Sequence, residues 1–237
     1  SGEANPDYST TYVFDNDFAA LTLDGAIAQG TSEGQLMRSE PVTGQCRVIC
    51  FSPRHDLTLP EMTVDAITGV VELWRDQYVE LIQNHAWVQV FENKGAVMGA
   101  SNPHPHCQVW ASDYLPSEPA QVDANLRAYL QDHGSPMLLD YVEAECRDGA
   151  RAVEENDHWL AVVPYWALWP FELLILPRRH VRHLGELHAN EHRSLAQMLK
   201  RCLTRYDNLF ETSFPYSMGW HQAPGFLAGM DKNRDHW

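Results

Sequence analysis

Two stretches of this 237-residue chain repeat one order of elements, which restricts the chain to folds built from two similar units. "RVICFSPRHDLTLPEMT" (47–63) has the pattern of a strand ending in Pro-Arg-His, a short connection and the start of a helix. "ELLILPRRHVRHLGELHANE" (172–191) has the same layout, which puts His55 and His180 in matching positions roughly 125 residues apart. The repeat predicts a tandem duplication.

Hydrophobic periodicity places one long helix in each unit. Apolar side chains recur at helical spacing over 63–83 and over 190–209, and Thr63 and Asn190 are suitable N-cap residues. A weaker helix is expected over 119–131. Runs rich in Val, Ile, Leu and aromatic residues predict strands at 11–14, 47–51, 87–91, 108–111, 159–164 and 172–176.

These elements predict an α+β fold in which each unit is a mostly antiparallel sheet with a long helix. The first unit is expected to span 1–115, and the second, expected to be truncated, to span 156–237. The linker between them, 116–155, is polar and contains the turn sequence "HGSP". Core positions or subunit contacts are expected for Trp159, Trp166, Trp169 and Trp220.

The charge of the chain excludes several classes of partner. With a formal net charge of −15, the protein gains nothing from counterion release on nucleic acid, and an anionic membrane surface repels it. No apolar run reaches the 18 residues of a membrane span, and no signal peptide is visible. The five cysteines include no CxxC pair, which favours a reducing, cytoplasmic compartment.

The stretch "SNPHPHCQVW" (101–110) concentrates chemically active side chains. Residues two apart on a strand point to the same face, so His104, His106 and Gln108 are expected to line one side. Pro103 and Pro105 bias the residues before them toward extended backbone and remove two N–H donors. Such a strand is expected at a sheet edge or a bulge.

Three interpretations of this stretch can be compared. Incidental loop histidines do not explain the regular His-Pro-His-x-Gln spacing after a glycine-containing turn. A metal site alone explains one histidine but not Gln108, which is a poor ligand and a good hydrogen-bond donor. Nucleophilic attack by an imidazole on phosphorus explains the whole pattern. It needs a backbone carbonyl to hold the other ring nitrogen, and donors such as Gln108 and Ser101 for the phosphoryl oxygens.

The longer stretch "FENKGAVMGASNPHPHCQVWAS" (91–112) resembles the galactose-1-phosphate uridylyltransferase family, a branch of the histidine-triad superfamily with glutamine in place of the third histidine. The resemblance extends over nearly the whole chain, through "NPDYSTTYVFDNDFAAL" and "RYDNLFETSFPYSMGWHQAP". It implies that His106 takes UMP from UDP-glucose and releases glucose 1-phosphate. Galactose 1-phosphate then attacks the uridylyl-histidine, while Gln108 and Ser101 contact the transferred group.

The resemblance also implies the remaining binding residues. Besides Ser101 and Gln108, the substrate-binding positions that it implies are Asn16, Asp17, Phe91, Asn93 and Gly99. Structural zinc would be bound by His55 and His104, and a second metal, iron or zinc, by His221. The family's zinc site also uses a CxxC pair, which this sequence does not contain, and Val122 stands at the position of a second-site glutamate, with Glu118 nearby. A cytoplasmic homodimer is implied as well.

Two other functions stay open on the sequence. A related nucleotide-sugar phosphorylase or adenylyltransferase acting on ADP-glucose has the same glutamine and differs only in base recognition. A hydrolase of the superfamily usually keeps a histidine at position 108, so Gln108 argues against it. A catalytically impaired nucleotide-binding module would bind the ligand without covalent modification.

Overall fold

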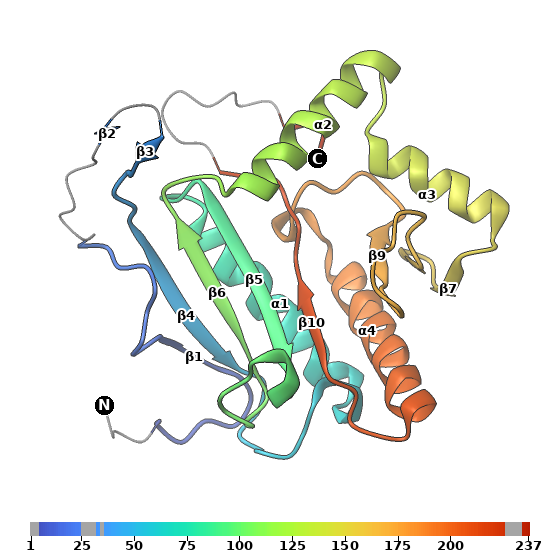
Figure 1. Ribbon diagram of the computed structural model, residues 1–237. Helices are drawn as coiled ribbons and strands as arrows, with labels where there is room; N and C mark the ends of the chain where they lie inside the picture. The colour runs from blue at the N-terminus through green and yellow to red at the C-terminus, as the bar shows by residue number, and fades with distance from the viewer. Residues whose placement is uncertain (1–4, 25–31, 34–35, 226–233) are drawn as a thin grey trace.

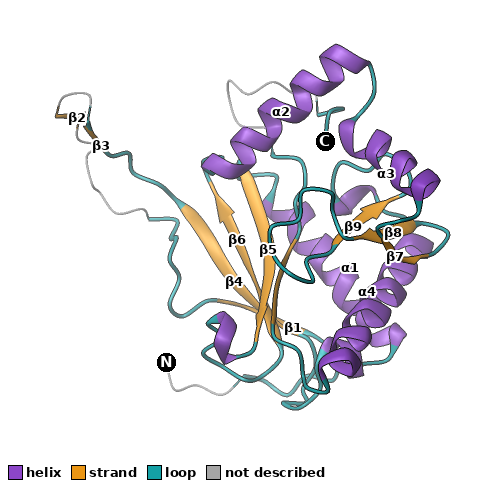
Figure 2. Ribbon diagram, turned by 45° about the vertical axis from the view of Figure 1, so that its right-hand side comes forward, coloured by secondary structure: helices purple, strands orange, loops and turns teal. Residues whose placement is uncertain are grey.

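The computed structural model describes residues 5–24, 32–33, 36–225 and 234–237, and it has the predicted α+β class. Its main feature is a five-stranded antiparallel sheet in the order β1-β4-β6-β5-β10 (Figure 1). Two long helices, α1 and α4, lie together on one side of this sheet (Figure 2). The five strands are β1 (Tyr12–Asp15), β4 (Gly44–Cys50), β5 (Trp87–Lys94), β6 (His106–Ser112) and β10 (Tyr216–Gly219).

Both long helices occupy the predicted segments. Helix α1 spans Val64–Leu81, and the Thr63 hydroxyl caps it by accepting a hydrogen bond from the Ala66 N–H at 3.2 Å. Helix α4 spans Ala189–Phe210, so the expected cap at Asn190 is wrong. His188 is the cap residue instead, because its backbone is extended and its N–H donates to the Glu191 carboxylate at 2.7 Å.

The second half of the chain contributes to two sheets. Strands β7 (Ala152–Glu155), β8 (Trp159–Val162) and β9 (Leu174–Pro177) form a three-stranded antiparallel sheet of their own. Strand β10, which follows α4, instead pairs with β5 of the first half in the register Tyr216↔Lys94. One strand from the second half therefore completes the sheet that carries His106 and Gln108 of the first half.

The segment expected to be a polar linker is largely helical. Its weak helix is confirmed as α2 (Ser117–His133), and the predicted turn reverses the chain at Gly134, whose φ is 77°. A further helix, α3 (Met137–Asp148), was not expected. Val142 of α3 packs into a small apolar cluster with β8 and β9, a tertiary contact that composition alone does not reveal. None of the described helices is long and apolar enough to cross a membrane.

Short elements complete the description. Strands β2 (Ser32–Glu33) and β3 (Met37–Arg38) form a small hairpin. Single 3-10 turns occur at Leu59–Glu61, Ala96–Met98 and Leu184–Glu186.

Trp159 is buried, whereas Trp166 and Trp169 are 49% and 76% exposed, so a core position is wrong for these two.

The core fills the space between the large sheet and the pair α1 and α4. Cys107 of β6 points into it, and the Trp74 indole N–H of α1 lies 3.1 Å from the Cys107 sulfur. Complete burial raises the pKa of this thiol well above its usual range. Cys107 is therefore a packing residue, and it anchors β6 directly beneath the outward-facing side chains of that strand.

His192 makes the stability of this core depend on pH. It is 1% exposed, and neither ring nitrogen has a hydrogen-bond partner in the described part of the chain. Desolvation lowers its pKa, so the native state keeps this ring neutral while the unfolded chain gains a proton as the pH falls through about 6.5. The stability of the native state is therefore unaffected by the titration of His192 above about pH 6.5, and it decreases below that pH as the unfolded chain binds the proton.

We expect the wild type to lose more unfolding free energy than His192→Leu between pH 7.5 and 5.5. For a single group the difference approaches about 1.4 kcal/mol per pH unit. Urea denaturation of both proteins at several pH values measures it. Parallel pH profiles would show that His192 takes no proton on unfolding.

Candidate active site

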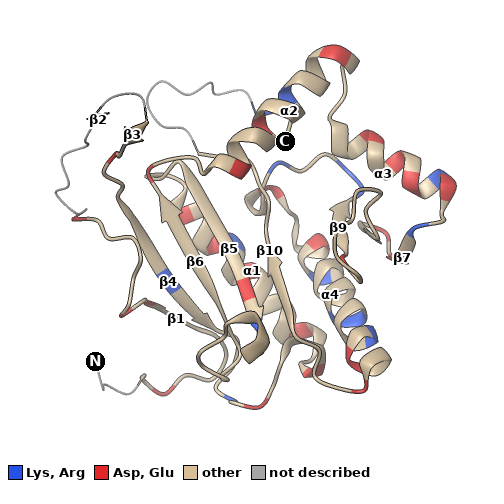
Figure 3. Cartoon of the chain, in the orientation of Figure 1, with Lys and Arg blue, Asp and Glu red and all other residues tan. Residues whose placement is uncertain are grey.

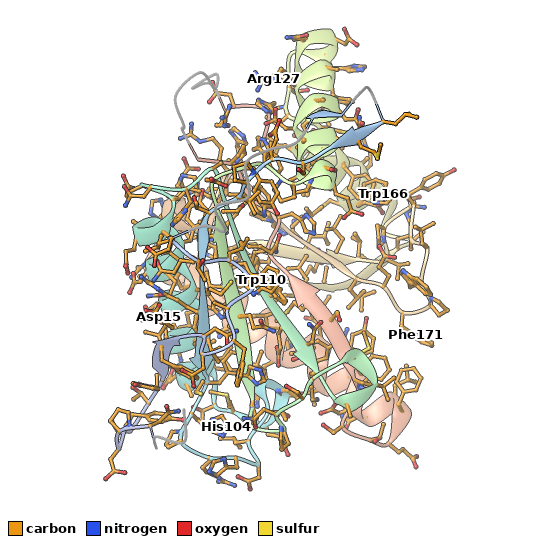
Figure 4. All side chains as sticks on the ribbon, turned by 60° about the vertical axis from the view of Figure 1, so that its left-hand side comes forward. Asp15, His104, Trp110, Arg127, Trp166 and Phe171 are labelled. Atoms are coloured by element: carbon orange, nitrogen blue, oxygen red, sulfur yellow. The ribbon has the colours of Figure 1, made fainter. Side chains whose placement is uncertain are left out.

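The face of the large sheet turned away from α1 and α4 carries the predicted site. Along β6 the side chains alternate, so that His106, Gln108 and Trp110 face outward while Cys107 and Val109 point into the core. Figure 4 shows Trp110 near the middle of the sheet and His104 toward one end. The expected common face is confirmed for His106 and Gln108, whereas His104 precedes β6 and its ring contacts His55 instead.

The expected edge position of this strand is wrong. Strand β6 lies at the centre of the sheet, between β4 and β5. The reason is that Pro103 and Pro105 precede the first ladder residue, His106, and so remove no hydrogen bond from the sheet. Pro105 joins the pairing with its carbonyl alone, which accepts from the Phe51 N–H at 3.1 Å.

His106 is held in one tautomer by the chain beside it. Its Nδ1 lies 2.7 Å from the backbone carbonyl oxygen of His104, and a carbonyl can only accept, so Nδ1 carries the proton. The neutral ring therefore has its lone pair on Nε2. This is the backbone contact that the nucleophile interpretation requires, and the extended His104-Pro105 segment supplies it.

A small depression in front of His106 collects most of the predicted site residues. The loop between β5 and β6 forms one wall, where Gly95 and Gly99 have φ values of 94° and 84° that other residues rarely adopt. The depression is lined by Phe91, Asn93, Gly99, Ala100, Ser101, His106, Cys107 and Gln108. The fold thus brings residues 91–108 of the sequence to one place.

Positive side chains do not contribute to this depression. None of the described residues that line it is a Lys or an Arg. Figure 3 shows few charged residues along the strands of the large sheet. On β4, Arg47 points toward α1, where it donates to Gln77 at 2.6 Å. Among the described lining residues, the hydrogen-bond donors available to an anionic group in front of His106 are therefore neutral.

Two carboxamides in the depression are held by their oxygen atoms. The Trp110 indole N–H donates to Gln108 Oε1 at 3.1 Å, and the Ser217 hydroxyl donates to Asn93 Oδ1 at 2.6 Å. Trp110 and Ser217 were not among the predicted site residues. The i,i+2 spacing of Gln108 and Trp110 could have indicated the first contact. The second needs the pairing of β10 with β5, which no local pattern predicts.

Asn16 and Asp17 lie at the edge of the same sheet and outside the depression. They follow β1, and the Asn16 N–H donates to the carbonyl of Cys46 on β4 at 2.8 Å. Cys46 pairs with Trp110, so Asn16 stands level with Trp110 and across β4 from it. The predicted nucleotide contacts therefore extend from the end of β1 across the sheet to β6 and β5 and do not form one cluster around His106.

His55 and His104 form a pair whose rings converge. Their Nδ1 atoms are 2.8 Å apart, and Tyr8 Oη lies 3.3 Å from His104 Nε2. Tyr8 donates to the Ser52 carbonyl, so it can accept from His104 Nε2–H, which leaves a lone pair on His104 Nδ1. Two nitrogen ligands of one tetrahedral zinc lie about 3.3 Å from each other, because each Zn–N bond is about 2.0–2.1 Å long. A small outward movement makes the pair fit.

The rest of a metal site is not found near this pair. Across residues 5–24, 32–33, 36–225 and 234–237, no three His, Cys, Asp or Glu side chains are grouped to hold a metal ion. The same holds for the predicted second metal. Desolvation lowers the pKa of His221, and the charge of the Glu118 carboxylate partly offsets this shift.

Comparisons with known proteins decide the family. The model "Galactose-1-phosphate uridyl transferase, N-terminal domain" matches residues 1–116, and the corresponding C-terminal domain model matches residues 122–237. A "Probable galactose-1-phosphate uridylyltransferase" of Drosophila melanogaster is 46% identical over this entire chain, which covers 67% of that protein. The chain belongs to the galactose-1-phosphate uridylyltransferase family.

Other members of the galactose-1-phosphate uridylyltransferase family are still more similar in sequence. The protein of that name from Haemophilus influenzae is 52% identical and that from Rattus norvegicus 50% identical, each over the whole of this chain. The chain spans 66% and 62% of their respective lengths. The predicted family is therefore confirmed, for a chain that covers about two thirds of these relatives.

Solved structures confirm the fold of the family. A chain described as "Structure of uridylyltransferase" has a TM-score of 0.86 and 27% identity, covering 96% of this chain and 72% of its own. An ADP-glucose phosphorylase from Arabidopsis thaliana with bound ADP-glucose has a TM-score of 0.77. At 23% identity, over 91% of this chain and 65% of that one, this second likeness concerns the fold alone.

For the zinc expected in this uridylyltransferase family, we predict that His104→Asn lowers zinc content and thermal stability together. The substitution removes the Nδ1 contact to His55 and the Nε2 contact to Tyr8, so a loss of several degrees in Tm is expected. Metal analysis after dialysis and a melting curve with and without added zinc are the measurements. A variant with unchanged zinc content would remove His104 from the metal site.

Proposed function

We propose that this protein transfers UMP from UDP-glucose to galactose 1-phosphate through a uridylyl group on His106. The observation that carries the proposal is the 2.7 Å contact between His106 Nδ1 and the His104 carbonyl, which leaves Nε2 as a nucleophile facing the depression. Membership of the family supports the reaction and its two sugar substrates.

In the first half-reaction, His106 Nε2 attacks the phosphorus of the UMP moiety. A P–N bond forms, the P–O bond to glucose 1-phosphate breaks, and glucose 1-phosphate leaves with the bonding electron pair. The imidazole gains positive charge as its lone pair is used. The His104 carbonyl dipole, already hydrogen-bonded to Nδ1–H, stabilises that charge.

In the second half-reaction, a phosphate oxygen of galactose 1-phosphate attacks the same phosphorus. The P–N bond breaks, its electron pair returns to Nε2, and UDP-galactose is released. Gln108 and Ser101, which line the depression, donate hydrogen bonds to the phosphoryl oxygens in both steps. We assign nucleotide contacts to Phe91, Asn93 and Gly99 in the depression and to Asn16 and Asp17 beyond it.

Further properties belong to the same proposal. We include a cytoplasmic homodimer, structural zinc on His55 and His104, and a second metal, iron or zinc, near His221. No chemical step passes through either metal. The domain boundaries at 115 and 156 also stay a prediction.

One labelling experiment, run with two nucleotide sugars, separates four candidate functions. The protein is incubated with UDP-glucose carrying a radioactive phosphate in the UMP moiety, then precipitated and washed. The transferase takes up label that galactose 1-phosphate removes as UDP-galactose, whereas a hydrolase releases free UMP and a binding module takes up no covalent label. ADP-glucose in place of UDP-glucose tests the phosphorylase function, which predicts faster labelling from the adenine nucleotide.

A further inference from the structure

The contact between Trp110 and Gln108 fixes which end of the carboxamide faces the depression. An indole nitrogen can only donate, so the atom 3.1 Å from Trp110 Nε1 must be the carbonyl oxygen Oε1 of Gln108. The two branches of a carboxamide diverge. The NH2 group of Gln108 is therefore turned away from the indole, and within the described part of the chain neither of its N–H donors has an acceptor.

The indole itself is held by the sheet. Trp110 pairs with Cys46 on one side and with Gln89 on the other, in the middle of a three-strand ladder. Its ring meets the edge of Phe91 at a centroid distance of 5.7 Å and an interplanar angle of 76°. Backbone pairing and ring packing thus set the direction of the N–H bond before any ligand binds.

The orientation matters because the two ends of a carboxamide have nearly the same shape. A Gln108 side chain turned by half a rotation about its last bond would place Oε1 toward the phosphoryl oxygens, where like partial charges repel. No Lys or Arg is present among the described lining residues to offset that repulsion. Among these lining residues the binding of an anion in front of His106 therefore depends on how the neutral donors are aligned.

We propose that Trp110 is a positioning residue, which acts through Gln108 by holding its NH2 group toward the transferred phosphoryl group. The inference rests on the proposed function of His106 and Gln108. Trp110 itself touches no reacting atom. Its effect should appear in the rate of uridylylation, with little change in the binding of nucleotide in the ground state.

A double-mutant cycle tests this inference. Trp110→Phe keeps a ring against Phe91 and removes only the donor, and it should lower the rate of uridylylation about five- to tenfold. In a Gln108→Ala background the same substitution should have no further effect, because no carboxamide is left to orient. Trp169→Phe, in an exposed loop, is the matched control. An equal cost in both backgrounds would overturn the inference and make Trp110 a packing residue.

A second readout does not depend on activity. In a proton–nitrogen correlation NMR spectrum, the Trp110 indole N–H signal is assigned by its loss in Trp110→Phe. In the wild type this N–H should exchange slowly with solvent. It should exchange faster in Gln108→Ala, because its acceptor is gone. Identical exchange in wild type and Gln108→Ala would show that the hydrogen bond does not form. If the wild type takes up no label from UDP-glucose, the proposed function fails, and the exchange rates still decide whether Trp110 holds the carboxamide.

Discussion

His106→Gly is expected to abolish UMP transfer and to leave the fold intact. The side chain faces the depression and is only half-buried, so its loss removes the nucleophile with little loss of core packing. Because no other described side chain in the depression can form the covalent intermediate readily, we expect the exchange rate to fall by at least about 10³-fold. Exchange of label between UDP-glucose and glucose 1-phosphate is the measurement.

A rescue experiment shows whether only the nucleophile is missing. UMP linked to free imidazole already contains the P–N bond that His106 would form. Offered to His106→Gly, it should transfer UMP to galactose 1-phosphate, because the donors of Gln108 and Ser101 are still in place. Unchanged far-ultraviolet circular dichroism controls for folding. A variant that retains near-normal exchange would contradict the covalent mechanism.

Gln108 is expected to decide how the covalent intermediate reacts. Its carboxamide neither accepts nor delivers a proton near neutral pH, so it cannot activate water. It does donate to the charged phosphoryl group, and Gln108→Ala should therefore slow uridylylation about 10- to 100-fold. Gln108→His places a possible general base beside the intermediate. We expect it to raise the ratio of UMP release to UDP-galactose formation by about tenfold or more.

The ratio of UMP release to UDP-galactose formation is measured at a fixed concentration of galactose 1-phosphate, by separating the two products. Gln108→Asn serves as the control, since it shortens the side chain but introduces no base. If Gln108→His leaves the ratio unchanged, then exclusion of water, and not the chemistry of residue 108, protects the intermediate.

The local part of the site could be predicted because it depends on strand alternation. Residues two apart share a face, so His106 and Gln108 had to lie together once this stretch was taken as a strand. The contact from His106 to the His104 carbonyl follows from the same short segment. The caps and periodicity of α1 were equally visible, because Thr63 and its apolar stripe are adjacent in sequence.

The parts that were missed depend on contacts between distant segments. The prolines suggested an edge strand, but they end just before the ladder begins, and β6 lies at the centre of the sheet. Nothing near Ser217 indicates that β10 pairs with β5, so its hydrogen bond to Asn93 was not foreseen. The apolar side chains of helix α3 pack against β8 and β9. The sequence does not show where this small sheet lies, so the apolar face of α3 could not be recognised.

The central claim is that His106 carries UMP during the reaction. The most direct measurement is mass spectrometry of peptides from protein quenched at alkaline pH after brief incubation with UDP-glucose alone, since phosphoramidates are labile in acid. The account predicts that the peptide containing residues 101–110 gains the mass of one UMP residue and that fragmentation places it on His106. It also predicts that galactose 1-phosphate removes this mass. UMP found on another residue, or catalytic turnover without any covalent species, would contradict the account.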